Sequence, residues 1–133
     1  MGATYLIDSN IAIYLLNGSL NENALTFIEP IINDAYSLSV ITKIELLGFT
    51  FSDANKLSET QYFIDDSTLL ALTDEIVTKT IELRQTFKIK PNRRTVPDAI
   101  IAASAIVFDL TLISRNDKDF KSLTNLKYLN PFD

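Results

Sequence analysis

The chain has 133 residues, of which 47% are hydrophobic and 22% are charged, and this suits one compact domain. It contains neither cysteine nor histidine, which excludes disulfides, thiolate metal sites and catalysis by serine–histidine or cysteine–histidine pairs. The formal net charge of −5 argues against a nucleic-acid binder, unless clustered acids are neutralised by a divalent cation or serve to attract a basic partner.

The first half of the chain predicts two strands, each followed by helices. Residues 4–7 form a short apolar run that is typical of a strand buried on both faces. Ser9 is expected to cap a helix that continues to about Leu16 and ends at Asn17-Gly18. The remaining predictions for this half are a helix over 23–34, a strand over 36–41, a helix capped by Thr42 that carries Glu45, and a helix over 52–63.

The second half continues the alternation of strands and helices. Thr73 is expected to cap a helix that reaches about Phe87, and the polar, basic segment 88–96 predicts a loop. Pro97 fits the first turn of a helix, and residues 99–108 are apolar nearly all round, which predicts a buried helix. The other predictions are a turn at 65–67, strands over 68–72, 111–114 and 126–129, and a helical turn over 117–121. The pattern predicts one α/β domain over residues 1–133 with a parallel sheet.

Acidic and amide side chains follow the predicted strands or begin predicted helices at four places. These places are Asp8, Glu45, Asp98 and the group Asn116, Asp117 and Asp119. In parallel sheets, ligands bind outside the carboxyl ends of the strands, so we expect these side chains to face one cleft. Clustered carboxylates repel one another unless a cation lies between them, and Mg²⁺ and Mn²⁺ prefer oxygen ligands. A metal held in this way can activate water and stabilise charge on a phosphodiester.

Each of these acids also has an ordinary structural explanation. Asp8 could cap the turn after its strand. Glu45 and Asp98 could complement the dipoles of the helices that they begin. Asp117 and Asp119 could be solvated loop charges. The joint placement of four sites is what favours the metal-binding interpretation.

Four strings, taken in order, carry a resemblance to a known family. They are Leu-Ile-Asp-Ser-Asn-Ile (6–11), Ile-Thr-Lys-Ile-Glu-Leu-Leu-Gly (41–48), Pro-Asp-Ala-Ile-Ile-Ala-Ala-Ser-Ala (97–105) and Leu-Ile-Ser-Arg-Asn-Asp-Lys-Asp-Phe (112–120). Together they resemble the PIN-domain family, and most closely its VapC-type toxins, over essentially the whole chain. The resemblance implies a Rossmann-like α/β/α domain with a parallel sheet. It also implies a Mg²⁺- or Mn²⁺-dependent endoribonuclease, commonly a homodimer, that a cognate antitoxin inhibits.

The resemblance also implies a role for each position. The family's first three acids fall on Asp8, Glu45 and Asp98. The fourth acid is ambiguous, because Asn116 stands where the family often has an acid, and Asp117 and Asp119 lie close by in the sequence. We therefore expect one metal ion rather than two, held mainly by Asp8 and Asp98. The candidate catalytic residues are Asp8, Glu45, Asp98 and Asp117; the candidate metal ligands are Asp8, Glu45, Asp98, Asn116, Asp117 and Asp119; and the candidate substrate-binding residues are Ser9, Asn10, Ser114 and Arg115.

Few basic groups are available to hold RNA. The candidates are Lys43, Lys90, Arg93, Arg94 and Arg115, each of which could equally be an ordinary surface charge. We expect the antitoxin to place an Arg or Lys in the acidic cleft, because a cation can replace the charge of the metal. The apolar residues 46–49 could join a dimer or antitoxin surface, although core packing is the commoner use of such side chains.

Three other functions compete with the nuclease. A phosphoacceptor receiver domain would need an acidic pair after the first strand, and a haloacid-dehalogenase-like phosphatase would need a second aspartate there, whereas Ser9-Asn10 follows Asp8. A non-catalytic RNA- or protein-binding module with the same fold stays open because of the ambiguous fourth position. The chain lacks a basic segment near its start and an apolar run that could span a bilayer, so we expect a cytoplasmic location.

Overall fold

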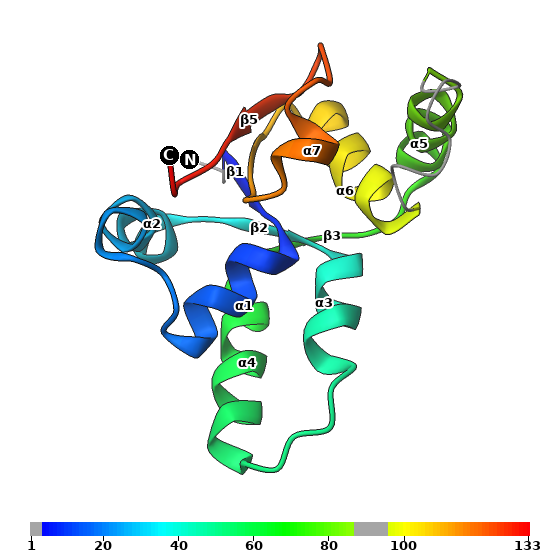
Figure 1. The fold of residues 1–133 in the computed structure, drawn as a ribbon. Helices are drawn as coiled ribbons and strands as arrows, with labels where there is room; N and C mark the ends of the chain where they lie inside the picture. The colour runs from blue at the N-terminus through cyan, green and yellow to red at the C-terminus, as the bar shows by residue number, and fades with distance from the viewer. Residues whose placement is uncertain (1–3, 87–95) are drawn as a thin grey trace.

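The computed structural model describes residues 4–86 and 96–133, in which strands alternate with helices (Figure 1). The strands are β1 (Tyr5–Ile7), β2 (Ser37–Ser39), β3 (Thr68–Leu70), β4 (Thr111–Ile113) and β5 (Lys127–Leu129). The helices are α1 (Ser9–Asn17), α2 (Glu22–Asp34), α3 (Val40–Leu47), α4 (Ala54–Asp66), α5 (Asp74–Thr86), α6 (Val96–Val107) and α7 (Asp117–Phe120). Most of the predicted loop over 88–96, with its basic side chains Lys90, Arg93 and Arg94, lies outside the described residues.

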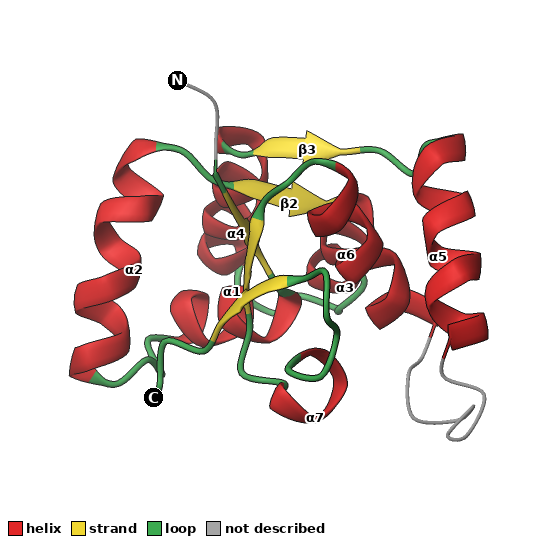
Figure 2. Ribbon diagram, turned by 90° about the horizontal axis from the view of Figure 1, so that it is seen from above, coloured by secondary structure: helices red, strands yellow, loops and turns green. Residues whose placement is uncertain are grey.

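The strands form one parallel sheet, as the sequence predicted, and the structure gives their order as β3-β2-β1-β4-β5. Figure 2 shows β2 beside β3, the strand at one edge of the sheet. β1 lies at the centre and pairs with β2 on one side and with β4 on the other. Neighbouring residues of a strand point to opposite faces, so the apolar runs Leu6-Ile7 and Leu112-Ile113 supply one core residue to each face. This explains why continuous apolar runs, rather than alternating ones, marked these two strands.

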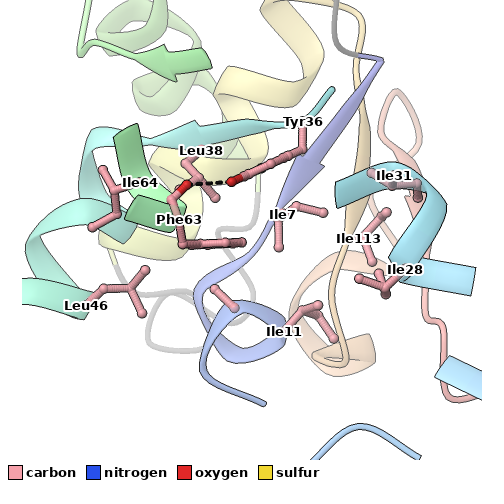
Figure 3. Packing of buried hydrophobic residues seen from close by; sticks show 11 residues of the cluster. Ile7, Ile11, Ile28, Ile31, Tyr36, Leu38, Leu46, Phe63, Ile64 and Ile113 are labelled. Atoms are coloured by element: carbon pink, nitrogen blue, oxygen red, sulfur yellow. Dashed lines mark hydrogen bonds between the residues drawn. The ribbon is translucent and has the colours of Figure 1, made fainter. Parts of the chain in front are cut away.

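Helices cover both faces of the sheet. Ile7 and Ile113 pack on one face against Ile11 of α1, Ile28 of α2 and Phe63 of α4 (Figure 3). On the other face, Leu6 and Leu112 pack against Ile101 of α6 and Phe120 of α7, and α5 packs on the outside of α6. Figure 1 shows α1 and α4 on one side of β2, with α6 and α7 on the other. The α/β/α architecture predicted for the chain is therefore confirmed.

The structure corrects two predicted helix starts. Asp8, rather than Ser9, caps α1, because its Oδ1 accepts a hydrogen bond of 2.8 Å from the Ser9 amide. Ser39, rather than Thr42, caps α3 through a bond of 3.0 Å from the Ile41 amide. α3 therefore begins at Val40, so the predicted strand over 36–41 ends two residues early, and the hydroxyls of Ser9 and Thr42 are left to bond elsewhere.

Other boundaries agree with the sequence or move by a few residues. Gly18 ends α1 as predicted, with a φ of 69° that favours glycine. The Thr73 hydroxyl accepts from the Ile76 amide at 3.3 Å and so caps α5 as predicted. α4 begins after Asp53 and includes Asp65-Asp66, which were predicted to form a turn. Every residue of 99–105 in α6 is buried, as its apolar sequence indicated.

In residues 4–86 and 96–133, no helix has both the length and the apolar character that crossing a membrane requires.

Candidate active site at the carboxyl end of the sheet

Asp8 lies at the carboxyl end of the central strand, and both oxygens of its carboxylate are held. Oδ1 accepts the Ser9 amide, and Oδ2 accepts the hydroxyl of Ser114, just after β4, at 2.7 Å. The side chain is only 4% exposed. Burial raises the pKa of Asp8 to about 6; the hydrogen bonds from Ser114 and Ser9 oppose this shift, and repulsion from Asp98 and Glu45 adds to it.

That repulsion shows that three of the predicted acids gather in space. Asp98 lies in the first turn of α6 and is half-buried, and Glu45 lies on the exposed side of α3. Both carboxylates act on Asp8 as nearby negative charges. β1, α3 and α6, which are far apart in the sequence, thus bring one carboxylate each to the same end of the sheet.

Glu45 is tied to the end of β1 through Ser9. The Ser9 hydroxyl donates to Glu45 Oε1 at 2.6 Å, and its oxygen lies 3.0 Å from the Thr42 hydroxyl oxygen. Ser9 and Thr42 are both buried, whereas Glu45 is exposed. Sequence reasoning missed the part played by Thr42, although its position one turn before Glu45 places both on the same side of α3.

Ser114 connects the ends of β1 and β4. Its buried hydroxyl donates to Asp8 and accepts from the Asn116 amide at 3.0 Å and from Asn10 Nδ2 at 3.3 Å. The Arg115 amide in turn donates to Asn10 Oδ1 at 3.4 Å. The structure therefore brings the predicted residues Asn10, Ser114 and Asn116 into one network with Asp8.

The candidates for the fourth acidic position point to different partners. Asn116 Nδ2 donates to Asp119 Oδ2 at 2.6 Å. Asp117 Oδ1 accepts the hydroxyl of Tyr128 at 2.5 Å and Nδ2 of Asn130 at 3.2 Å, and these bonds hold the pKa of Asp117 below its usual value. Asp117 therefore joins α7 to the segment at β5, a contact for which the sequence carried no signal.

Arg115 carries a positive charge on the loop that follows β4. Its guanidinium lies over the ring of Phe132, 4.2 Å from the centroid, and 5.6 Å from the centroid of Tyr14. The two rings also contact each other edge to face. Cation–π contacts of this kind restrain an otherwise flexible side chain, so the aromatic pair sets the position of this cation.

The donors at this end of the sheet fit a hard divalent cation. Asp8 is buried beside two other carboxylates, and none of the causes of its raised pKa is a nearby cation. Within the described ranges, no three acidic side chains lie close enough together to hold a metal ion by themselves. Mg²⁺ commonly uses one or two carboxylates and completes its shell with water. The carboxylates of Asp8 and Asp98 are donors of this kind, and Glu45 is a third carboxylate whose charge acts on Asp8.

Comparisons with known proteins identify the family. Residues 5–126 match the PIN domain, and the chain therefore belongs to the PIN-domain family, which confirms the family resemblance of the four strings. No curated protein matches the sequence.

Solved structures with the same fold cover nearly the whole chain. One is VapBC2 from Rickettsia felis, bound to a DNA fragment from its own promoter. It has a TM-score of 0.80 and 23% identity, and the match covers 95% of this chain and 97% of that chain. DNA-bound VapBC from Salmonella typhimurium has a TM-score of 0.82 and 18% identity, with 98% and 99% covered. A toxin–antitoxin complex from Klebsiella pneumoniae has a TM-score of 0.76 and 25% identity, with 97% and 98% covered.

Proposed function

We propose that this chain is a VapC-type toxin, a Mg²⁺- or Mn²⁺-dependent endoribonuclease that a cognate antitoxin inhibits. The observation that carries the proposal is the gathering of Asp8, Glu45 and Asp98 at the carboxyl end of the sheet, where the other two raise the pKa of the first. A buried carboxylate with a perturbed pKa beside like charges is a typical feature of a catalytic or metal-binding site. Membership of the PIN-domain family and the toxin–antitoxin complexes among the structural neighbours support the same function.

Different carboxylates would bind the metal ion and accept the proton. Asp8 and Asp98 would hold the metal ion, which when bound would lower the pKa of a water molecule and offset charge on the scissile phosphate. Glu45 would orient that water and accept its proton. The oxygen of the water would bond to phosphorus while the bond to the leaving oxygen breaks, and the leaving oxygen would take a proton from solvent. With no histidine in the chain, a carboxylate is the natural base.

The neighbouring polar groups would position the RNA. Asn10 and Ser114 hold the loop that carries Arg115, and the rings of Tyr14 and Phe132 fix the guanidinium of Arg115. A restrained guanidinium suits a phosphate oxygen. Asn116 and Asp119, which bond to each other, would complete the metal shell or contact the phosphate, and Asp117 would support the loop through Tyr128.

Inhibition by an antitoxin is the second part of the proposal. Neighbouring acids favour a partner that places an Arg or Lys among them, because that cation can offset the charge that the metal otherwise offsets. Phe49 is 62% exposed and borders a cavity of about 350 Å³ between α1 and α4, whereas Leu46 is buried in the core. Of the apolar residues 46–49, Phe49 thus has the most exposed side chain, and we expect it to contact an antitoxin or a second copy in a homodimer.

Cleavage of a mixed pool of structured RNA by the purified protein tests the nuclease. We expect cleavage in Mg²⁺ or Mn²⁺ and none in EDTA. Asp98→Asn keeps the size of the side chain but removes its charge, and should lower the rate by about 100-fold or more because it weakens metal binding. Asp34→Asn, at the exposed end of α2, is the matched control and should cleave like the wild type.

Two results would contradict the proposal. Full activity of Asp98→Asn would remove Asp98 from the site. Absence of cleavage together with absence of metal binding by calorimetry would favour the alternative function, a non-catalytic PIN-fold module that binds RNA or protein. Metal binding without cleavage would instead indicate a narrow RNA target or residual antitoxin in the preparation.

A further inference from the structure

Two hydroxyl groups whose sequence positions predicted helix caps meet each other instead. Asp8 and Ser39 take over the capping of α1 and α3. The hydroxyls of Ser9 and Thr42 consequently lie 3.0 Å apart, across 33 residues of sequence, in a buried contact between the two helices. Apolar side chains at these two positions would stabilise the fold equally well, so the presence of two hydroxyls there needs an explanation.

The direction of the hydrogen bonds follows from counting protons. Each hydroxyl has one proton to donate, and an ionised carboxylate only accepts. Ser9 donates its proton to Glu45 Oε1 at 2.6 Å. The bond between Ser9 and Thr42 must then be donated by Thr42. The three side chains therefore form one directed chain, from Thr42 through Ser9 to Glu45.

The three hydrogen-bonded side chains become more exposed from Thr42 to Glu45. Thr42 is 0% exposed and Ser9 is 8% exposed, while Glu45 lies on the surface. An exposed glutamate side chain ordinarily samples many rotamers, and holding one of them costs conformational entropy. Here a fully buried hydroxyl anchors the link that holds Glu45, so the orientation of Glu45 is set from within the core.

The bond made by Thr42 differs from those of other hydroxyl side chains in the helices. Thr60, Thr80 and Ser104 each donate back to the backbone carbonyl four residues earlier in their own helix. That local bond is the usual one for such a residue within a helix. The bond of Thr42 runs to α1 instead, which links the two helices that carry Ser9 and Glu45.

We propose that Thr42 is a positioning residue: its buried hydroxyl directs the proton of Ser9 toward Glu45, which fixes Oε1 and leaves Oε2 for the reacting water. This inference rests on the proposed function of Glu45 as the base. Thr42 touches neither substrate nor metal in this arrangement, so its effect on the reaction passes entirely through Ser9.

Substitution of Thr42 by valine and by serine tests the proposal. Thr42→Val keeps the shape and removes the hydroxyl, and it should lower kcat for RNA cleavage by about 10-fold or more, because small misplacement of a catalytic group is costly, with KM changed less than about twofold. Thr42→Ser restores the hydroxyl and should recover most of the activity. Thr80→Val, which removes another buried helical hydroxyl, is the matched control and should leave kcat unchanged.

The link through Ser9 is tested by combining substitutions. Ser9→Ala should lower kcat at least as much as Thr42→Val, and Thr42→Val should lower it no further when Ser9 is already alanine. Independent, multiplicative losses would overturn the proposal. So would a Thr42→Val protein that behaves like Thr80→Val, or a Thr42→Ser protein that recovers nothing.

A second measurement does not depend on cleavage. In the metal-free protein, the effects of Thr42→Val and Glu45→Ala on the free energy of unfolding should be non-additive when Ser9 is present and additive when Ser9 is alanine. Additive effects in both backgrounds would overturn the chain of hydrogen bonds. A wild-type protein that neither cleaves RNA nor binds metal but shows this coupling would contradict the proposed function and leave the positioning of Glu45 by Thr42 standing.

Discussion

Asp8 carries its negative charge at a cost to the stability of the metal-free protein. Its pKa is about 6, against 3.8 for an ordinary aspartate, because burial removes it from water. The folded state therefore binds the proton more tightly than the unfolded state does. The contribution of Asp8 to the free energy of unfolding should be highest below about pH 4 and should fall as the pH rises to about 6. At about 1.4 kcal/mol per pKa unit, the loss is about 3 kcal/mol at most.

We predict that Asp8→Asn stabilises the metal-free protein while it abolishes metal-dependent activity. Asparagine has nearly the same shape and no charge to bury, so the free energy of unfolding at neutral pH should rise by about 1–3 kcal/mol. Urea denaturation in EDTA across the range from about pH 4 to pH 8 measures this. The decline in stability between pH 4 and pH 6 should disappear in Asp8→Asn and persist in Asp34→Asn. If the stability of Asp8→Asn declined with pH as that of the wild type does, Asp8 would not be the cause of the decline.

At the scale of the elements, α1 ends at a residue, Gly18, whose backbone is in the left-handed region. Gly18 adopts a φ of 69°, and a Cβ built there would meet nothing within 4 Å. Gly18→Ala should therefore destabilise the protein through backbone strain alone, by about 1 kcal/mol. Gly18→Asn should cost less, because asparagine tolerates this conformation. Thermal denaturation should show the order glycine, asparagine, alanine; an alanine variant as stable as the wild type would contradict the strain.

The elements themselves could be predicted from the sequence because their signals are local. Two of the strands are continuous apolar runs, Gly18 ends a helix, and the sequence of α6 is apolar all round. The exact helix starts could not be predicted, because Asp8 competes with Ser9, and Ser39 with Thr42, for the same capping role. The packing of α1 against α3 decides which residue caps each helix, because it brings the hydroxyls of Ser9 and Thr42 into a hydrogen bond with each other.

The place of the candidate site in the fold could be predicted in part. Asp8 and Asp98 follow from the rule that ligands bind at the carboxyl ends of parallel strands. The partners of Asp117 could not be foreseen, because Tyr128 and Asn130 reach it from β5 and the segment after it. Side-chain hydrogen bonds between distant segments leave no periodic signal in a sequence.

For the whole molecule, the net charge of −5 and the acids near Asp8 lead us to expect that a divalent cation stabilises the folded state. A ligand that binds only the folded state raises its stability, by about 2.7 kcal/mol at a hundred times its Kd. We predict that Mn²⁺ raises the Tm of the wild type and of Asp34→Asn, and that EDTA reverses the increase. Asp98→Asn should show little or no increase. An equal increase in Asp98→Asn would place the cation elsewhere on the acidic surface.

The central position of β1 has a consequence for the synthesis of the protein. β1 is made first, yet it pairs in the finished sheet with β4, more than a hundred residues later, and Asp8 receives its bond from Ser114 only then. Parallel pairing across such a separation forms late in folding. A growing chain on the ribosome therefore carries Asp8 without its bond from Ser114 until β4 and the residue after it have been made. A fragment that ends before β4 would lack the bond from Ser114 to Asp8, and on the proposed function we expect such a fragment to cleave no RNA.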